Sequence, residues 1–534
     1  MIALFQSQVN LMPLTTQKPM PEKFANITIP TDYSELYAMF STSELDDIVQ
    51  IKRFFECTEG DQIYREALQT GNFSEEQLTH LRQVGVLFDL SEISILWQDQ
   101  AFIDLVFKEI HKLDSIQALS EGTLEKLQQY PKLMLWLRFS YLKIHMHHTH
   151  KEIVLKRAYG RSSKYAQWRQ RRIEATKSEL GSYGESIDHP VLAIELGVGC
   201  SIGCYFCAFD APGLSQLFDY NVPENRQLFR DVAASLYRLL GDSAGHALLY
   251  WSTEPKDNPH YIEFMEIYRE ITGRVVCTAT ASSEESWIRN LIQHYRRFPA
   301  PWPRISVLTK KIMHRLHEQF TPEEFRDVAL LMQQRESEMV RAKVPGGRPK
   351  MLKKLEESVD IREEPEGDIS QASVPQGSIA CVSGFLINMV DKTVKLISPC
   401  YTSAQYPYGY RVFDEAIFQD AADFDRIIHR MVDRRMALTP YRDMPMRFRD
   451  DLRYVEQENG FLLISRHRIH RFVNDEFLTS LARLIAQGNF NHHQVCEILL
   501  DQNGLNPMLV LAAIKNFFDQ GFLDELQVDC STTI

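Results

Sequence analysis

The apolar residues of this chain follow two different periods along its length. Up to about residue 180 they recur every three to four positions, as in the stretch 43–55, and Ser74 precedes an acidic amphipathic run. This spacing is typical of helices that bury one face, and a serine before such a run is typical of an N-terminal cap. We therefore expect residues 1–180 to form a helical N-terminal region.

Between residues 181 and 404, short apolar stretches alternate with helical stretches. Helices are expected to begin at Ser282 and Thr321, because a glutamate three residues later completes the pattern of a capping box. Strands that alternate with helices predict a parallel sheet that binds its ligands at the carboxyl ends of the strands. The expected strands are 191–196, 247–251, 274–278 and 304–308, with a later pair joined around Asp391-Lys392.

Residues 405–534 begin with a helical stretch and end in a compact pattern of strands and helices. The stretches 452–456 and 461–465 flank Asn459-Gly460, which is a strong signal for a β-hairpin. Helices with one apolar face are expected from Asn474 and from Asn506. The pattern predicts a helical linker followed by a winged-helix-like domain, whose helices carry few Lys or Arg for binding DNA.

Three cysteines lie on a glycine-rich stretch directly after the first expected strand. Cys200, Cys204 and Cys207 have the spacing Cys-x3-Cys-x2-Cys, and no second pair of ligands follows soon after. A structural zinc site usually has four protein ligands in two close pairs. Three thiolates can instead hold three irons of a 4Fe-4S cluster and leave the fourth iron open for a small molecule. The spacing therefore favours an iron–sulfur cluster over zinc.

Charge and cysteine usage limit the classes of function. The 534 residues carry a formal net charge of −12, which argues against general binding to nucleic acids. We find neither an apolar run of membrane-spanning length nor a signal peptide, and the other cysteines are scattered. We therefore expect a cytoplasmic protein with reduced cysteines that binds neither nucleic acid nor membranes.

The cysteine motif resembles that of the radical S-adenosylmethionine (SAM) enzymes. This resemblance implies an α/β fold with a partial (β/α)6 barrel, a 4Fe-4S cluster on the three cysteines and SAM at the open iron. After the second expected strand, the family has a Gly-Gly-Glu-like segment that binds the amino group of SAM. Here Ser252 and Thr253 replace the glycines and Glu254 matches the acid, for which a solvated loop carboxylate is the alternative. The resemblance also assigns Phe206 to the cofactor.

In more detail, the chain is similar to the proteusin-type radical SAM epimerases that mature ribosomally synthesised peptides. Besides the cysteine motif, the segments 253–259 and 380–389 carry this resemblance. It implies that a 5′-deoxyadenosyl radical removes the Cα hydrogen of an L-residue and that a cysteine thiol returns a hydrogen atom, which leaves the D-residue.

Two cysteines are candidates for the thiol that returns the hydrogen atom. We expect Cys381 at the mouth of the barrel, where a late strand ends, and take Cys400 as the second choice. A buried structural thiol is the alternative for Cys381, and Cys277, in the third strand, is expected in the core, because free cysteine is commonly buried.

The resemblance also implies partners. These are a precursor peptide with a leader, which the C-terminal domain could capture as an added strand, and a reductant such as flavodoxin or ferredoxin. Two other functions remain open: a radical SAM enzyme that forms crosslinks or thioethers in a peptide, and a non-catalytic iron–sulfur protein that binds peptides.

Two polar stretches complete the sequence. The run 156–172 holds seven Lys or Arg and no acid, and we expect a solvated helix face, with binding of an acidic peptide or of the cofactor carboxylate as the alternative. The stretch 341–376 is rich in Gly, Pro, Lys and Glu and is expected to form a loop.

Overall fold

A computed structural model describes residues 29–110, 121–158, 161–181, 184, 187–298, 303–334, 347–348, 380–440 and 442–525. The chain forms two compact units, and each unit combines stretches that are not consecutive in the sequence. The first unit comprises residues 1–156, 200–204 and 248–342, and the second comprises residues 157–199, 205–247 and 343–534. No helix in the described ranges is both long and apolar enough to cross a bilayer.

Helices make up the N-terminal part of the first unit. Its α3 and α5 begin at capping boxes, so the helix start expected at Ser74 is confirmed. Phe54, Leu96 and Leu137 belong to the apolar core that these helices share. The helices are α2 (Tyr33–Ala38), α3 (Thr42–Gly60), α4 (Gln62–Thr70), α5 (Glu75–Gln83), α6 (Ile95–Gln98), α7 (Gln100–Ile110), α8 (Glu121–Gln128) and α9 (Pro131–Ala158).

A parallel sheet forms the rest of the first unit. Its strands β5 (Ala279–Thr280), β6 (Arg304–Val307) and β7 (Ala329–Met332) pair in chain order. Leu248, the last residue of β4 (Ala247–Leu248), forms a further parallel bridge with Cys277. The connecting helices are α13 (Tyr261–Thr272), α14 (Glu285–Arg296) and α15 (Lys310–Gln319). The protein is thus of mixed α/β class, and the six-stranded barrel stays a prediction.

The two expected capping boxes in this region do not begin helices. Thr321 and Glu324 exchange the two bonds of a capping box, but only a turn follows before the chain enters β7. The helix expected at Ser282 begins at Glu285 instead, and the Ser282 hydroxyl accepts a bond from the Glu284 N–H group. The expectation at Thr321 is wrong because pairing with β6 extends residues 329–332, which we had not identified as a strand.

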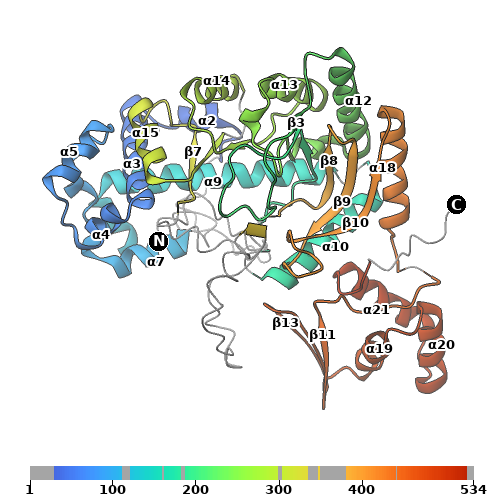
Figure 1. The fold of residues 1–534 in the computed structure, drawn as a ribbon. Helices are drawn as coiled ribbons and strands as arrows, with labels where there is room; N and C mark the ends of the chain where they lie inside the picture. Colours follow the sequence, from blue (N-terminus) through green and yellow to red (C-terminus); the bar gives the residue numbers. More distant parts are fainter. Residues whose placement is uncertain are drawn as a thin grey trace, which may run out of the picture. The chain divides into compact units, whose positions relative to one another are not determined.

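The second unit contains a five-stranded sheet with the order β10-β9-β8-β1-β4. In it β1 (Leu192–Glu195) runs parallel to β8 (Gly384–Asn388), while β8, β9 (Thr393–Pro399) and β10 (Tyr410–Ile417) are antiparallel neighbours. The strand pair expected around Asp391-Lys392 is confirmed, whereas β10 was not anticipated. The helices of this unit include α10 (Ser163–Leu180), α12 (Pro223–Leu240) and α18 (Ala421–Arg435), of which α12 and α18 pack side by side (Figure 1).

The C-terminal domain has three antiparallel strands followed by three helices. The hairpin at Asn459-Gly460 is confirmed, and a Cβ atom at Gly460 would lie only 2.0 Å from the Phe472 carbonyl oxygen. Phe461 and Phe517 belong to its core. The elements are β11 (Arg453–Gln457), β12 (Gly460–Ile464), β13 (Ile469–Val473), α19 (Glu476–Gln487), α20 (His492–Asn503) and α21 (Pro507–Asp519), of which β13 was not expected.

Candidate iron–sulfur and cofactor site

The cysteine-bearing stretch begins where β1 ends. Asn388, the last residue of β8, donates hydrogen bonds to Glu195 at 3.2 Å and to the Gly197 carbonyl at 3.0 Å. The short strands β2 (Gly197–Val198) and β3 (Gln216–Leu217) then pair and close the loop. At Gly199, where φ is 83°, a Cβ atom would lie 2.4 Å from the Gly213 carbonyl oxygen. Gly199 is therefore needed for this close approach.

The surroundings of the cysteines suit thiolate ligands. Cys200, Cys204 and Cys207 are half-buried and form no disulfide with another described residue. Burial raises the pKa of Cys200, while the backbone N–H groups of Ile202 and Gly203 bond to its sulfur and act in the opposite direction. The backbone N–H group of Ala211 lies 3.5 Å from the Cys207 sulfur. Such N–H groups stabilise metal-bound thiolates and tune the potentials of iron–sulfur clusters.

A site for one metal ion needs several ligands that converge on a single point. In the parts of the chain that the structure describes, no group of three or more His, Cys, Asp or Glu side chains is so arranged. A structural zinc site requires this convergence. In a cubane each thiolate binds a different iron, so the three cysteines need not converge on one point.

Glu254 is a buried acid in the first unit, with 6% of its surface exposed. Its carboxylate accepts hydrogen bonds from the N–H groups of Ala281 at 2.9 Å and Lys256 at 3.2 Å, and from the Thr280 hydroxyl. Burial raises the pKa of Glu254, and these donors oppose the shift. The alternative of a solvated loop acid is therefore wrong, because the carboxylate is fixed at the carboxyl end of β5.

Asp257 connects the segment 253–259 to the cysteine stretch within the first unit. The N–H group and hydroxyl of Ser201 donate to its carboxylate at 3.0 and 2.5 Å. We did not single out Asp257 from the sequence, although its short spacing from Glu254 was visible there. The segment thus holds a buried acid at β5 and also fixes the residue that follows Cys200.

The other residues assigned to the cofactor are accessible. Ser252 and Thr253 are half-buried immediately before Glu254. In the second unit, Phe206 is half-buried and packs its ring edge-on against Tyr205, with 5.1 Å between the ring centres. Their roles toward SAM stay predictions.

The two cysteines expected to donate the hydrogen atom lie at the end of the five-stranded sheet opposite to the cysteine stretch. Cys381 precedes β8, and Cys400 follows β9, whose last residues pair with the start of β8. The cysteine stretch leaves the other end, because β1 and β8 are parallel and Glu195 pairs with Asn388. Cys400 is also fully buried, and burial raises the pKa of its thiol well above the usual value. The placement expected for Cys381 is therefore wrong, because this residue comes before its strand.

One face of the parallel sheet in the first unit is only half-buried. Thr278 and Thr280 lie on the buried face and bond to Tyr261 of α13 at 3.0 Å and to Trp287 of α14 at 3.3 Å. Parallel sheets usually bury both faces, so the other face marks a space that solvent can reach. Cys277 lies on this half-buried face. The expectation that it lies in the core is therefore wrong. The half-buried positions of the sheet are Cys277, Ala279, Arg304, Ser306, Ala329 and Leu331.

Glu59 is a buried acid for which no sequence motif gave a signal. Glu59 lies next to Gly60, the last residue of α3. The Gly60 carbonyl accepts a hydrogen bond of 2.5 Å from the side chain of Gln334, which follows β7. Both carboxylate oxygens of Glu59 are shielded from solvent and have no hydrogen-bond partner among the described residues. Burial, together with the neighbouring Glu56, raises the pKa of Glu59 well above its usual value. A buried acid without a partner at the carboxyl end of a parallel strand is typical of a functional site.

We expect Glu59→Gln to stabilise the protein at pH 7.5 by about 1 to 3 kcal/mol, because a neutral amide replaces a buried acid whose ionised form is disfavoured. An acid with a raised pKa in the folded state destabilises that state once the pH exceeds the unfolded pKa of about 4.3. The gain should therefore shrink as the pH falls toward about 4. Urea denaturation at both pH values measures the effect, with exposed Glu66→Gln as the control. A change in the free energy of unfolding that is the same at both pH values, or a loss of stability at pH 7.5, would contradict this account.

The C-terminal half of the basic run is buried, contrary to the expectation of a solvated face. Arg171 and Arg172 on α10 both form ion pairs with Glu525, the first at 2.9 Å. Burial alone would raise the pKa of Glu525, but Arg172 and Arg171 outweigh burial and hold the pKa below its usual value. The expectation was wrong because the acid that pairs with these arginines lies near the other end of the chain.

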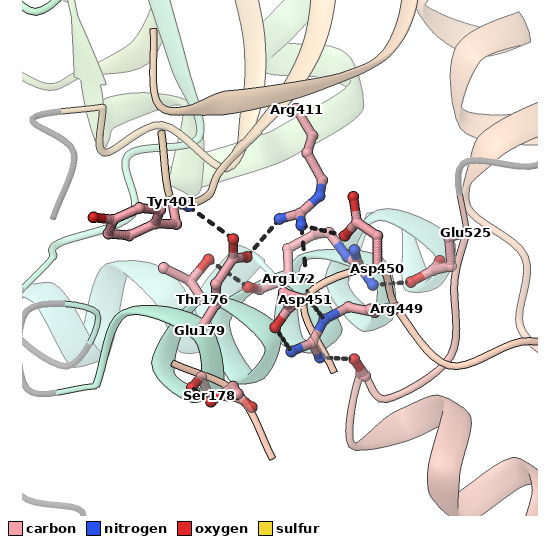
Figure 2. Close-up of polar contacts among 12 residues, drawn as sticks. Arg172, Thr176, Ser178, Glu179, Tyr401, Arg411, Arg449, Asp450, Asp451 and Glu525 are labelled. Carbon is pink, nitrogen blue, oxygen red and sulfur yellow. Dashed lines mark hydrogen bonds and ion pairs between the residues drawn. The ribbon is translucent and has the colours of Figure 1, made fainter. Parts of the chain in front are cut away.

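A second set of ion pairs, around the buried side chains of Arg411 and Glu179, lies farther along α10, as Figure 2 shows. Arg411 of β10 donates to Glu179 at 2.5 Å and to Asp450 at 2.6 Å. The Tyr401 N–H group also donates to Glu179, at 2.8 Å. This network joins α10, the five-stranded sheet and the start of the C-terminal domain within the second unit.

The fold and the cysteine loop define a mixed α/β protein with a candidate thiolate site, and sequence comparisons add its family. Residues 446–522 match the family model of the y4wI C-terminal domain. The uncharacterized protein y4wI of Sinorhizobium fredii (strain NBRC 101917 / NGR234) is 30% identical over 481 residues, which cover 89% of this chain and 87% of that protein. No solved structure matches the chain. The chain belongs to the y4wI family.

Proposed function

We propose that this protein is a radical SAM enzyme that modifies a peptide. The observation that carries the proposal is the cysteine stretch: three half-buried cysteines with the Cys-x3-Cys-x2-Cys spacing, directly after a strand with a parallel neighbour. Backbone N–H groups directed at the sulfurs of Cys200 and Cys207 suit thiolates that hold a cluster. When bound, a 4Fe-4S cluster and SAM supply a 5′-deoxyadenosyl radical that can abstract a hydrogen atom.

The residues of this chain would hold the reactants. Cys200, Cys204 and Cys207 would bind three irons, and the buried carboxylate of Glu254 would accept hydrogen bonds from the ammonium group of SAM. The bonds from Ala281 and Thr280 keep this carboxylate in one orientation, so it can align a cofactor. Asp257 would limit movement of the cysteine stretch through its two bonds to Ser201.

The C-terminal domain supports a peptide as the substrate. In the three-stranded sheet that the structure describes, β11 and β13 are edges that pair with no further strand. An open edge of this kind can bind an extended leader peptide as an additional strand. The net charge of −12 is unfavourable for a nucleic acid as the alternative ligand.

We assign the reaction as the conversion of L-residues to D-residues in a ribosomally synthesised precursor. With the cluster and SAM bound, one hydrogen atom would leave Cα for the adenosyl carbon, and a cysteine S–H group of this chain would return one to Cα. The sulfur radical then takes one electron from a reductant such as flavodoxin or ferredoxin and one proton from solvent, which restores the thiol. Carbon–carbon crosslinking and thioether formation are the competing reactions, and a non-catalytic peptide-binding protein is the competing class.

The positions of the thiols add a candidate for the hydrogen donor to the two that the sequence suggested. Cys381 and Cys400 lie at the amino end of β8, away from the end where the cysteine stretch begins. Cys277 is half-buried on the accessible face of the parallel sheet, opposite the face covered by α13 and α14. We therefore add Cys277 to the candidates, beside Cys381 and Cys400. The donor is the cysteine whose alanine variant still forms 5′-deoxyadenosine but no longer forms D-residues.

Solvent deuterium should label each inverted residue. Because a thiol exchanges its hydrogen with water, co-expression with a precursor peptide encoded beside the gene, in deuterated water, should place one non-exchangeable deuterium at each inverted Cα. Fragmentation by mass spectrometry locates the label, and the product made in ordinary water should have an unchanged mass. Loss of two hydrogens per event would instead indicate crosslinking. A precursor that binds but is unmodified, without SAM cleavage, would indicate the non-catalytic protein.

A further inference from the structure

Gly347 and Arg348 contact the turn that follows the third cysteine of the motif. The Arg348 backbone N–H group donates to the Cys207 carbonyl at 3.1 Å. Its side chain donates through Nε to Asp210 Oδ1 at 2.9 Å and through Nη2 to the Ala211 carbonyl. One arginine from a distant part of the sequence therefore holds both ends of the turn 207–211. Apart from these two residues, the expected loop 341–376 lies outside the described residues.

The same turn positions an N–H group against the sulfur of Cys207. The Asp210 N–H group donates to the Cys207 carbonyl at 3.1 Å, and the next one, from Ala211, lies 3.5 Å from Cys207 Sγ. Asp210 has a φ of 46°, in the left-handed region that aspartate adopts more readily than most residues other than glycine. The ion pair with Arg348 fixes the side chain of this turn residue.

Gly347 permits the close approach of this segment. Its φ is 53°, and a Cβ atom would lie 2.5 Å from the carbonyl oxygens of both Cys207 and Ala208. Its N–H group donates to the Pro407 carbonyl at 3.4 Å. Any side chain here would clash with backbone atoms of the turn, so the contact requires glycine.

We propose that Gly347 and Arg348 form a clamp that positions Cys207 and raises the reduction potential of the cluster bound there. This inference rests on the proposed function. An N–H group directed at a ligand sulfur favours the reduced cluster, which carries one more negative charge. Loss of the guanidinium would also leave the Asp210 carboxylate unbalanced near Cys207, and a nearby negative charge disfavours reduction. Both effects act in the same direction.

The test is a redox titration of the full-length protein after anaerobic reconstitution with iron and sulfide. For Arg348→Ala we expect the ratio of reduced to oxidised cluster at a fixed potential to fall about tenfold, which is about 59 mV for one electron. Arg348→Lys should give a smaller shift, because an ammonium can pair with Asp210 but lacks the planar fork that also reaches Ala211. Electron paramagnetic resonance of the reduced cluster should change in parallel.

Two control variants, Arg238→Ala and Gly504→Ala, distinguish loss of the clamp from a general loss of stability. Arg238→Ala removes an ion pair of similar length in the same unit, 2.8 Å to Asp425, and should leave the potential unchanged. Gly347→Ala keeps the arginine but prevents the close approach, so it should lower the potential as Arg348→Ala does. Its control is Gly504→Ala, at a φ of 63° with no atom within 4 Å of the new methyl group.

Each result decides the proposal. Unchanged potentials and spectra in the Arg348 and Gly347 variants, with a normal wild-type cluster, overturn the clamp alone. A wild-type protein that binds no four-iron cluster overturns the clamp and the proposed function together. If Arg348→Ala does not fold, Arg348→Lys and Gly347→Ala decide the question.

Discussion

We expect Cys204→Ala to lose the iron–sulfur cluster and, with it, the reductive cleavage of SAM. Only two thiolates of the motif would remain, and a cubane that has lost one of three protein ligands is weakly held. Loss of a residue that only hydrogen-bonds to a metal ligand lowers metal affinity or activity about 10- to 100-fold. Loss of the ligand itself should therefore reduce 5′-deoxyadenosine formation by at least about 100-fold. Iron per chain and 5′-deoxyadenosine per minute are the quantities to measure.

Cys496→Ala is the matched control for this experiment. Cys496 is a free, buried thiol in the C-terminal domain, and it lies among the apolar residues of that domain's core. Its replacement should leave the iron content and SAM cleavage unchanged. Undiminished SAM cleavage by Cys204→Ala would show that the motif does not hold the cluster, and the proposed function would then be wrong.

We expect Arg411→Met to destabilise the protein by about 3 to 5 kcal/mol, the typical effect of removing one partner from a buried ion pair. Arg411 is 5% exposed, and Glu179, which accepts its bond of 2.5 Å, is 3% exposed. The variant leaves the Glu179 carboxylate buried with only the Tyr401 N–H group as a partner in this network. Urea denaturation followed by circular dichroism measures the free energy of unfolding.

Arg238→Met provides the comparison for an exposed pair. Its partner Asp425 lies 2.8 Å away, but the arginine side chain is 61% exposed, so we expect a change of at most about 1 kcal/mol. Similar effects of the two substitutions would show that burial does not determine the contribution of the Arg411 network. Because this network joins α10 to residues 449–451, Arg411→Met should also make the C-terminal domain more accessible to proteases (Figure 2).

The polar contacts of α10 give a structural role to the basic run 156–172, which we had expected to form a solvated face. Arg171 and Arg172 pair with Glu525, and Ser178 bonds to His470 of β13 at 2.8 Å. Residues of α10 thus contact both the last described residue of the chain and a strand of the C-terminal domain. This arrangement holds the domain proposed to bind the leader against α10 by specific polar contacts.

Features set by neighbours in the sequence could be predicted from the sequence alone. The serine cap at Ser74, the hairpin at Asn459-Gly460 and the strand before the cysteine motif each depend on residues only a few positions apart. The spacing of the three cysteines is likewise a local property, and it supports the proposed chemistry without knowledge of the fold. Local hydrogen bonds and backbone preferences are sufficient to produce these features.

Only the tertiary structure decided the features that depend on distant partners. The direction of β8 follows from its pairing with β1, and this pairing places Cys381 at the end of the sheet away from the cysteine stretch. Arg348 holds the turn after Cys207 although the whole parallel sheet β5-β6-β7 lies between these two residues in the sequence. The isolation of Glu59 depends on how α3 and β7 pack. Strand pairing and burial are set by residues far apart in the chain, so the sequence determined the reactive motif, and the tertiary structure determined which side chains surround it.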